Sequence, residues 1–190
     1  MMSFSHKAAI FVAIGVLLAT SAAAQPSTVI LVRHAEKATT PGNDPDLSAA
    51  GMLRARDLAS ALADARIASI IVTQLQRTHA TARPTAEAGG VTPIVVRVTG
   101  DVPAHVQAVV AAVRSRPAGQ AVLVVGHSNT IPAIVTALGG PRLPDLCDSQ
   151  YGTLFILDFT VPGSPRLIRA KYGASDPPES EACPQPMRQP

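Results

Sequence analysis

The sequence predicts an α/β protein, a three-layer α/β/α sandwich with a largely parallel central sheet. Short apolar runs rich in Val and Ile alternate along the chain with segments whose apolar residues recur every three or four positions. The runs are apolar at nearly every position, which is typical of strands that are covered on both faces. The sequence shows no internal repeat and no second domain.

Six runs are predicted to form strands because they are short, apolar and mostly β-branched. In chain order they are STVILV (27–32), IASIIVT (67–73), TPIVVRV (92–98), AVLVVGH (121–127), TLFILDF (153–159) and RLIRA (166–170).

Four segments between these runs are predicted to form helices. Three of them carry one apolar face at helical spacing: Ala55, Leu58, Ala59 and Leu62; Val106, Val109, Val110 and Val113; and Ile131, Ile134, Val135 and Leu138. The remaining helix, within residues 77–90, contains Pro84, which is expected to kink it or end it early.

The N-terminal residues 1–24 resemble a secretory signal peptide, with one Lys, a short apolar run and small residues up to Ala24. A retained membrane anchor is the alternative, but the apolar run is shorter than the ~20 residues of a spanning helix. We therefore expect a periplasmic or secreted protein without a membrane anchor in its mature form. Residues 25–172 form the predicted domain, and the Pro-rich residues 173–190 form an irregular tail.

The charge and the two cysteines exclude further functional classes for this protein. The net charge is +3, and about +2 remains without Lys7, so the chain lacks the basic stripe of a nucleic-acid-binding protein. The two cysteines, Cys147 and Cys183, have no partner at metal-ligand spacing and in an exported protein are expected to form a disulfide.

Polar residues gather where the predicted strands end, and parallel strands deliver such residues to one edge of the sheet. Arg33 and His34 follow the first strand, Arg77 lies just after the second, and His127 follows the fourth. Arginine binds phosphate oxygens through a planar fork of donors, and a neutral imidazole is a competent nucleophile. The residue types at this edge favour phosphoryl transfer, and they require neither a metal nor a cofactor.

Four motifs in this order resemble the histidine phosphatase superfamily, also called the phosphoglycerate mutase-like family. They are LVRHAEK (31–37), LSAAGMLRARDLASAL (47–62), TQLQRTHATARP (73–84) and VVGHSNT (124–130). The resemblance implies a phosphoglycerate mutase-like fold and a covalent phosphohistidine mechanism. His34 would be the nucleophile, Arg33 and Arg77 would clamp the phosphate, and His127 would bind the phosphoryl oxygens.

The chain departs from the family pattern at several positions. Ala35 replaces the usual glycine after the first histidine, and Ser128 replaces the aspartate that some branches use as proton donor after the second. Other branches take a donor from the loop after the third strand, which here points to Asp101. We expect either Asp101 as general acid or no strong acid, in which case phosphoramidates, whose leaving group is good, remain substrates.

Each of these residues also has a structural interpretation. Asp101 is a candidate N-cap of the helix that Pro103 opens. Ser128 contributes to the predicted phosphate site, and with Asn129 it is also expected to cap the next helix. Glu36 is expected to be a solvated neighbour that orients Arg33.

Two other functions are alternatives to the phosphatase. The motif VVGHSNT is similar to the nucleophile elbow of serine esterases, but no histidine follows His127 to complete a triad. A non-catalytic module of the cell envelope that binds a phosphorylated ligand would need the same pocket. We therefore predict an exported, metal-independent phosphatase whose partner is a phosphorylated small molecule, envelope sugar or phosphoprotein.

Overall fold

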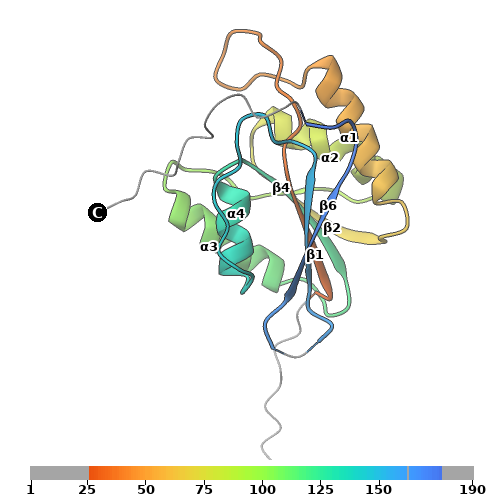
Figure 1. The fold of residues 1–190 in the computed structure, drawn as a ribbon, viewed down its shortest axis with the longest axis vertical. Coiled ribbons are helices and arrows are strands. Elements are labelled where there is room, and N and C mark those ends of the chain that lie inside the picture. Colours follow the sequence, from red (N-terminus) through yellow and green to blue (C-terminus); the bar gives the residue numbers. More distant parts are fainter. Residues whose placement is uncertain (1–25, 162, 177–190) are drawn as a thin grey trace, which may run out of the picture.

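The computed structural model describes residues 26–161 and 163–176 (Figure 1). It contains six strands and four helices in the predicted order. The strands are β1 (Thr28–Arg33), β2 (Ile67–Val72), β3 (Ile94–Val95), β4 (Ala121–Gly126), β5 (Thr153–Asp158) and β6 (Arg166–Lys171). The helices are α1 (Ala49–Ala61), α2 (Gln76–Gly89), α3 (Val102–Arg114) and α4 (Thr130–Ala137). The predicted signal peptide, residues 1–24, lies outside the described residues.

All six strands form one sheet in the order β3-β2-β4-β1-β5-β6. β3, β2, β4 and β1 run parallel, β5 is antiparallel to β1, and β6 is antiparallel to β5. The largely parallel sheet is confirmed, and β1 and β4 are central in it.

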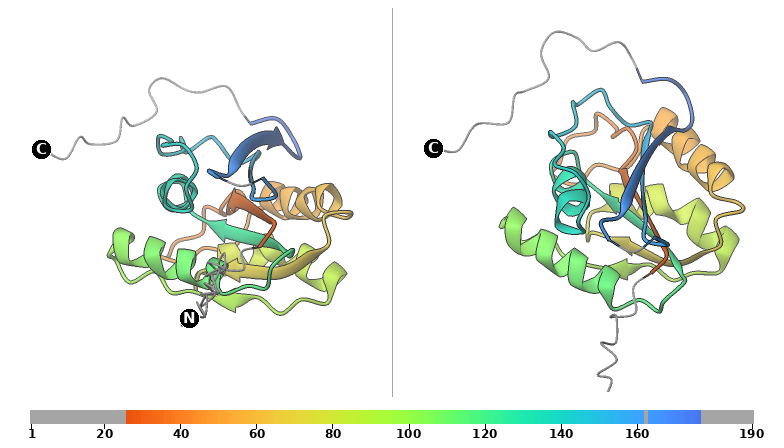
Figure 2. Two further views of the ribbon diagram at one scale, coloured as in Figure 1. Left: turned by 90° about the horizontal axis from the view of Figure 1, so that it is seen from below. Right: turned by 60° about the horizontal axis from the view of Figure 1, so that its bottom comes forward.

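The helices cover both faces of the sheet, with α1 and α2 on one side and α3 and α4 on the other (Figure 2). Alternate residues of β1 enter the two cores: Val29 and Leu31 pack with α3 and α4, and Ile30 and Val32 pack with α1 and α2. The valine stripe of α3 and the isoleucine-rich face of α4 are buried as predicted. The three-layer sandwich is therefore confirmed.

β3 is shorter than predicted, with two residues in the ladder instead of a run over 92–98. The side chain of Gln74 pairs with the chain beyond it: Val98 N–H donates to Gln74 Oε1 (2.8 Å) and Gln74 Nε2 donates to Val98 O (3.0 Å). A side-chain amide thus replaces the backbone partner that a longer strand would have used.

Pro84 lies inside α2, which continues to Gly89, so of the two predicted outcomes an early end of the helix was wrong and a kink stays a prediction. Proline removes one backbone donor, but the residues that follow it, Thr85 and Ala86, are buried against the sheet side of the helix. Tertiary packing therefore holds the last turn of α2 in place.

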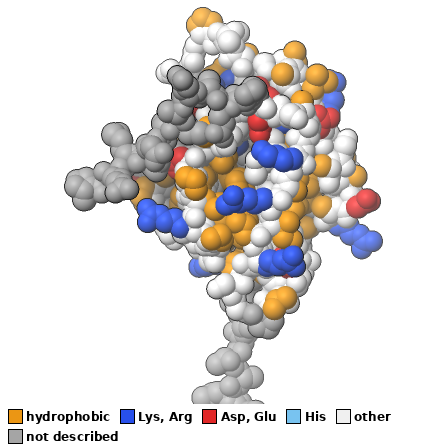
Figure 3. Space-filling model, in the orientation of Figure 1, with side chains coloured by type: hydrophobic (Ala, Val, Ile, Leu, Met, Phe, Trp, Pro, Cys, Tyr) orange, Lys and Arg blue, Asp and Glu red, His pale blue; other side chains and the backbone are white. Residues whose placement is uncertain are grey.

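β6 is an edge strand that carries exposed cations. Arg166, Arg169 and Lys171 are exposed along it, and Lys and Arg side chains gather over the middle of this face of the molecule (Figure 3). Charged side chains on an edge strand disfavour pairing with another chain. In the ranges 26–161 and 163–176, no helix combines the length and apolar character needed to cross a bilayer.

Candidate active site

His34 and His127 meet because their strands are neighbours. β1 and β4 pair in parallel with Arg33 opposite Gly126, and the N–H of His34 donates to Gly126 O at 2.9 Å. The two histidines follow these paired residues, and their ring centroids lie 5.4 Å apart with 62° between the ring planes. Both side chains are buried, so the predicted meeting of the two imidazoles is present in the structure.

His34 is oriented by its own backbone neighbour. Its Nδ1 lies 2.8 Å from Ala35 O, a carbonyl oxygen that can only accept, so Nδ1 carries the proton in the neutral ring. Nε2 then holds the free lone pair. The pKa of His34 is lowered to about 3, mainly by burial; the bond to Ala35 O opposes this shift, and the nearby Arg33, His127 and Arg77 add to it. At neutral pH the imidazole is uncharged, the form that a nucleophile requires.

His127 is held by residues from two neighbouring segments. Its Nε2 lies 3.2 Å from Thr73 Oγ1, at the end of β2, and its backbone N–H donates to Thr130 Oγ1 at 3.0 Å. Burial lowers the pKa of His127 to about 4, with Arg77 the next contributor. Thr73 is a site residue that the sequence analysis missed, since only the β2–β4 pairing brings it beside His127.

Arg33 is buried and anchored by the segment before β5. Its Nη1 donates to the carbonyl oxygens of Cys147, Asp148 and Gln150 at 2.8, 3.1 and 3.2 Å. The guanidinium also stacks on the Tyr151 ring at 4.1 Å, and Nη2 lies 3.4 Å from Asp148 Oδ1. These contacts fix the outer nitrogens and leave Nε for a ligand.

Arg77 lies in the first turn of α2, and its side chain is 15% exposed. Its Nη1 lies 3.5 Å from Asp44 Oδ1, and burial lowers its pKa with a further contribution from Arg33. In the described part of the chain, Nε of Arg77 and Nε of Arg33 are both buried without a hydrogen-bond partner. Buried unpaired donors on two cations are a site for an anion such as a phosphoryl group.

One cavity of about 450 Å³ unites these groups. All predicted site residues except Asp101 line it, and so do residues that the sequence analysis did not single out. The lining residues are Arg33, His34, Lys37, Leu75, Arg77, Val98, Val102, His127, Ser128, Asn129, Thr130 and Asp148. Among the described residues, no group of three or more His, Cys, Asp or Glu side chains is placed to hold a metal ion.

Asp101 lies at the start of α3 and not in the cavity lining. Its Oδ1 accepts from the N–H of Ala104 at 3.1 Å, so it is the N-cap of α3, and the residue is exposed. The structure supports the capping interpretation. A role as general acid stays a prediction.

One prediction on a neighbouring residue was wrong, and another was right only in part. Glu36 does not orient Arg33 but binds Arg54, with Oε1 2.8 Å from Nε and 2.7 Å from Nη2. Asn129 is the N-cap of α4, as predicted, but its side chain makes no cap bond, and Thr130 supplies the hydroxyl that accepts from His127 N–H. Arg54 is a buried residue whose position depends on distant parts of the chain. Its guanidinium lies beside Glu36 and binds this carboxylate in place of Arg33.

The segment after β6 is tied to the domain at its beginning. Arg54 Nη1 donates to the carbonyl oxygens of Tyr172 and Ala174, and Asp176 Oδ1 accepts from the N–H groups of Tyr151 and Gly152. Asp176 thereby braces the segment that anchors Arg33. Cys147 is buried, and its predicted disulfide partner Cys183 lies outside the described residues.

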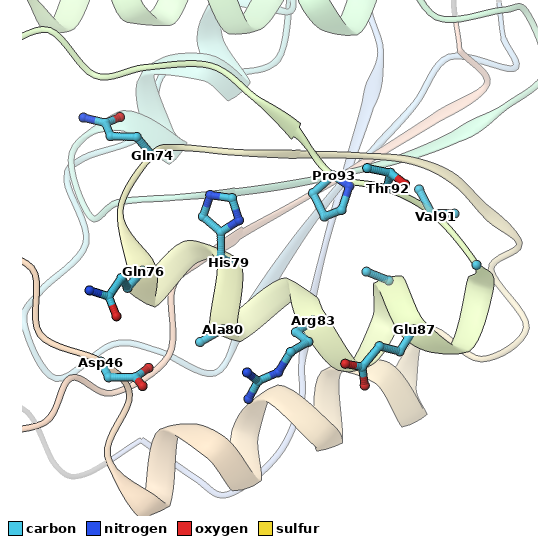
Figure 4. A pocket seen from close by; sticks show the side chains of 12 residues that line it. Asp46, Gln74, Gln76, His79, Ala80, Arg83, Glu87, Val91, Thr92 and Pro93 are labelled. Carbon is cyan, nitrogen blue, oxygen red and sulfur yellow. The ribbon is translucent and has the colours of Figure 1, made fainter.

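A second cavity of about 580 Å³ lies beside the active-site cavity, along α2 (Figure 4). Gln74 and Gln76 line this cavity, whereas Leu75 and Arg77 line the active-site cavity, so the segment 74–77 separates the two. His79 belongs to this second cavity and not to the histidine pair.

Comparisons with known proteins bear on the family resemblance and on the fold. The profile of the histidine phosphatase superfamily (branch 1) matches residues 29–99. No curated protein matches the sequence. The profile confirms the predicted resemblance to this superfamily over those residues.

Solved structures show the same fold. The putative phosphohistidine phosphatase SixA from Agrobacterium tumefaciens is 23% identical, with a TM-score of 0.54, over 79% of this chain and 99% of that chain. The protein histidine phosphatase SixA complexed with tungstate is 17% identical, with a TM-score of 0.58, over 76% and 96%. The mycobacterial glucosyl-3-phosphoglycerate phosphatase Rv2419c is 18% identical, with a TM-score of 0.56, over 78% and 99%.

Proposed function

We propose that this protein, which resembles the histidine phosphatase superfamily, is a phosphatase that hydrolyses phosphomonoesters or phosphoramidates through a phosphohistidine on His34. One observation carries the proposal: two buried imidazoles lie 5.4 Å apart in a cavity that also receives two arginines, each with an unpaired Nε. A site that only bound phosphate would not need the imidazole of His34 held neutral with Nδ1 bound and Nε2 free.

In the first step, Nε2 of His34 attacks the phosphorus atom. A P–N bond forms, the bond to the leaving group breaks, and the leaving group departs with its electron pair and takes up a proton. The Nε donors of Arg33 and Arg77 bind the phosphoryl oxygens, where charge gathers in the transition state. His127, which lines the same cavity, would bind a phosphoryl oxygen that the arginines leave free.

In the second step, a water molecule attacks the phosphohistidine. The P–N bond breaks, inorganic phosphate leaves, and Nε2 regains its lone pair. The bond from Nδ1 to Ala35 O holds the ring in one orientation through both steps. The arginines supply the positive charge, so we propose that the reaction requires no metal ion.

The leaving-group proton separates two substrate classes. Alkyl phosphates need a general acid, for which Asp101 is the candidate, whereas phosphoramidates depart without strong acid assistance. Asparagine caps helices about as well as aspartate, so Asp101→Asn removes the acid and keeps the cap of α3. Loss of activity on alkyl phosphates alone would support Asp101, and an unchanged rate on them would eliminate it.

The physiological substrate is proposed only as a class: a phosphorylated small molecule, envelope sugar or phosphoprotein. The names of the structural neighbours support this range, because they include a phosphohistidine phosphatase and a phosphatase of a glucosylated phosphoglycerate. We also propose export with removal of residues 1–24, and a Cys147–Cys183 disulfide in the mature protein. The sequence pattern of the N-terminus and the pair of cysteines support these two proposals.

A phosphatase screen of the mature protein tests the proposed function. An aryl phosphate, a panel of alkyl phosphates and a phosphohistidine peptide are assayed with chelator present, and His34→Ala is the control. We expect turnover by the wild type and its loss in the variant. Tight phosphate binding without turnover of any substrate would instead identify a binding module.

A further inference from the structure

The helix that carries Arg77 is capped from a distant part of the chain. The N-cap position of α2 is Leu75, whose side chain has no acceptor. The carboxylate of Asp44 takes this place: Gln76 N–H donates to Oδ1 and Oδ2 at 3.0 and 3.1 Å. Figure 4 shows the segment that carries Asp46 passing beside the first turn of α2, where Gln76 stands.

The same carboxylate is the anchor of Arg77. Asp44 Oδ1 lies 3.5 Å from Arg77 Nη1, and in the described residues the guanidinium has no other hydrogen-bonding or ion-pair partner. Arg33 differs, because three backbone carbonyls and the Tyr151 ring hold it in addition to Asp148. Each arginine thus has a carboxylate neighbour, but only the guanidinium of Arg77 depends on that carboxylate for its position.

We propose that Asp44 is the positioning residue of the phosphate site, which fixes the start of α2 and the guanidinium of Arg77 so that Nε faces the phosphoryl group. The inference rests on the anion site of the proposed function. According to this proposal, the negatively charged Asp44 strengthens the binding of an anion.

Positioning by Asp44 and a purely electrostatic effect of its charge predict opposite changes in phosphate affinity when the charge is removed. A carboxylate beside a phosphate site repels the phosphate, so its neutralisation alone would tighten binding. The loss of a positioning group loosens binding, because Arg77 must then be ordered when the ligand arrives. Asp44→Asn keeps an oxygen for the N–H of Gln76 and removes the charge that holds Arg77.

The test is calorimetric titration of the full chain with inorganic phosphate, for the wild type, Asp44→Asn and the matched control Asp46→Asn, an exposed carboxylate of the same segment that does not line the active-site cavity. We expect Asp44→Asn to weaken phosphate binding about tenfold, the scale of one hydrogen bond to a charged group. Asp46→Asn should bind phosphate as tightly as the wild type, because among the described residues no ion pair joins Asp46 to Arg77. Equal or tighter binding by Asp44→Asn would overturn the inference.

A double-mutant cycle separates positioning from a general structural effect. In an Arg77→Gln background, Asp44→Asn should cause no further loss of phosphate affinity, since the residue acts through Arg77. A full additional loss would show that Asp44 acts elsewhere and would also overturn the inference. Because binding needs no turnover, a wild type that binds phosphate but hydrolyses nothing would reject the proposed reaction alone, and one that binds no phosphate would reject both.

Discussion

At the scale of single residues, the site depends on two histidines kept neutral by burial. Their pKa values, about 3 for His34 and about 4 for His127, lie below the ordinary 6.5 of an unfolded chain. Neutral imidazoles persist well below neutral pH, so the proposed nucleophile is not lost by protonation in mildly acidic solution.

The difference between the histidine pKa values of the folded and the unfolded chain predicts how stability depends on pH. Between about pH 6.5 and pH 4, the unfolded chain takes up protons on both histidines and the folded chain does not, so stability falls as the pH falls. Each histidine contributes a slope of about 1.4 kcal/mol per pH unit in this window. Urea unfolding at pH 7 and pH 5 should show a smaller loss of stability in a His34→Asn/His127→Asn variant than in the wild type. Equal losses would show that the histidines are not buried in their neutral form.

Arg33 offers a test of donor geometry at constant charge. Lysine at this position keeps one positive charge but loses Nε, the Nη1 that donates to three carbonyls, and the stack on Tyr151. We expect kcat/KM of Arg33→Lys to fall about a hundredfold, the usual cost of one donor to a transition state. The exposed Arg83 on α2 provides the control, and Arg83→Lys should leave kcat/KM unchanged. Near-normal activity of Arg33→Lys would mean that only the charge matters.

At the scale of secondary structure, the sequence predicted the strands and helices well because apolar pattern reports burial directly. The valine stripe of α3 predicts a buried helix face, and it packs in the core that α3 shares with α4 and the sheet. β3 and Pro84 were predicted less well, because their outcome depends on contacts with other segments: the amide of Gln74 completes β3, and packing carries α2 past Pro84. Local sequence does not contain those contacts.

The Gln74 clamp provides a prediction at this scale. Gln74→Ala leaves the N–H and C=O of Val98 without their partner and is expected to destabilise the protein by about 1–2 kcal/mol. Gln76→Ala, two residues away with an exposed side chain, is the matched control and should cost little. Chemical denaturation measures both. Equal effects of the two substitutions would contradict a specific role of the clamp.

The candidate site shows the same division between what the sequence predicts and what it does not. Arg33, His34, Arg77, His127 and Ser128 were predicted because they follow strands that parallel pairing brings together. Lys37, Thr73 and Asp148 also line or contact the site but carried no signal. The position of Asp148 follows from the irregular segment before β5, which Arg33 and Asp176 organise, and no periodic pattern describes that segment.

At the scale of the whole molecule, the proposed disulfide would tie the C-terminal region to the segment that anchors Arg33. In the chain-entropy model, closing this loop stabilises the fold by roughly 4 kcal/mol. We therefore expect dithiothreitol to lower the free energy of unfolding of the mature wild type by about this amount and to have no such effect on Cys183→Ser. Reaction of both cysteines with an alkylating reagent in the native, unreduced protein would contradict the pairing.

The proposed function depends on one chemical event, the transfer of a phosphoryl group to His34. Rapid quenching of the enzyme during turnover, followed by peptide mass spectrometry under conditions that preserve phosphohistidine, tests it most directly. We predict one phosphoryl group on the peptide that contains His34, formed faster than the overall turnover. A phosphoryl group on another residue, or steady turnover with no phosphorylated peptide, would contradict the covalent mechanism.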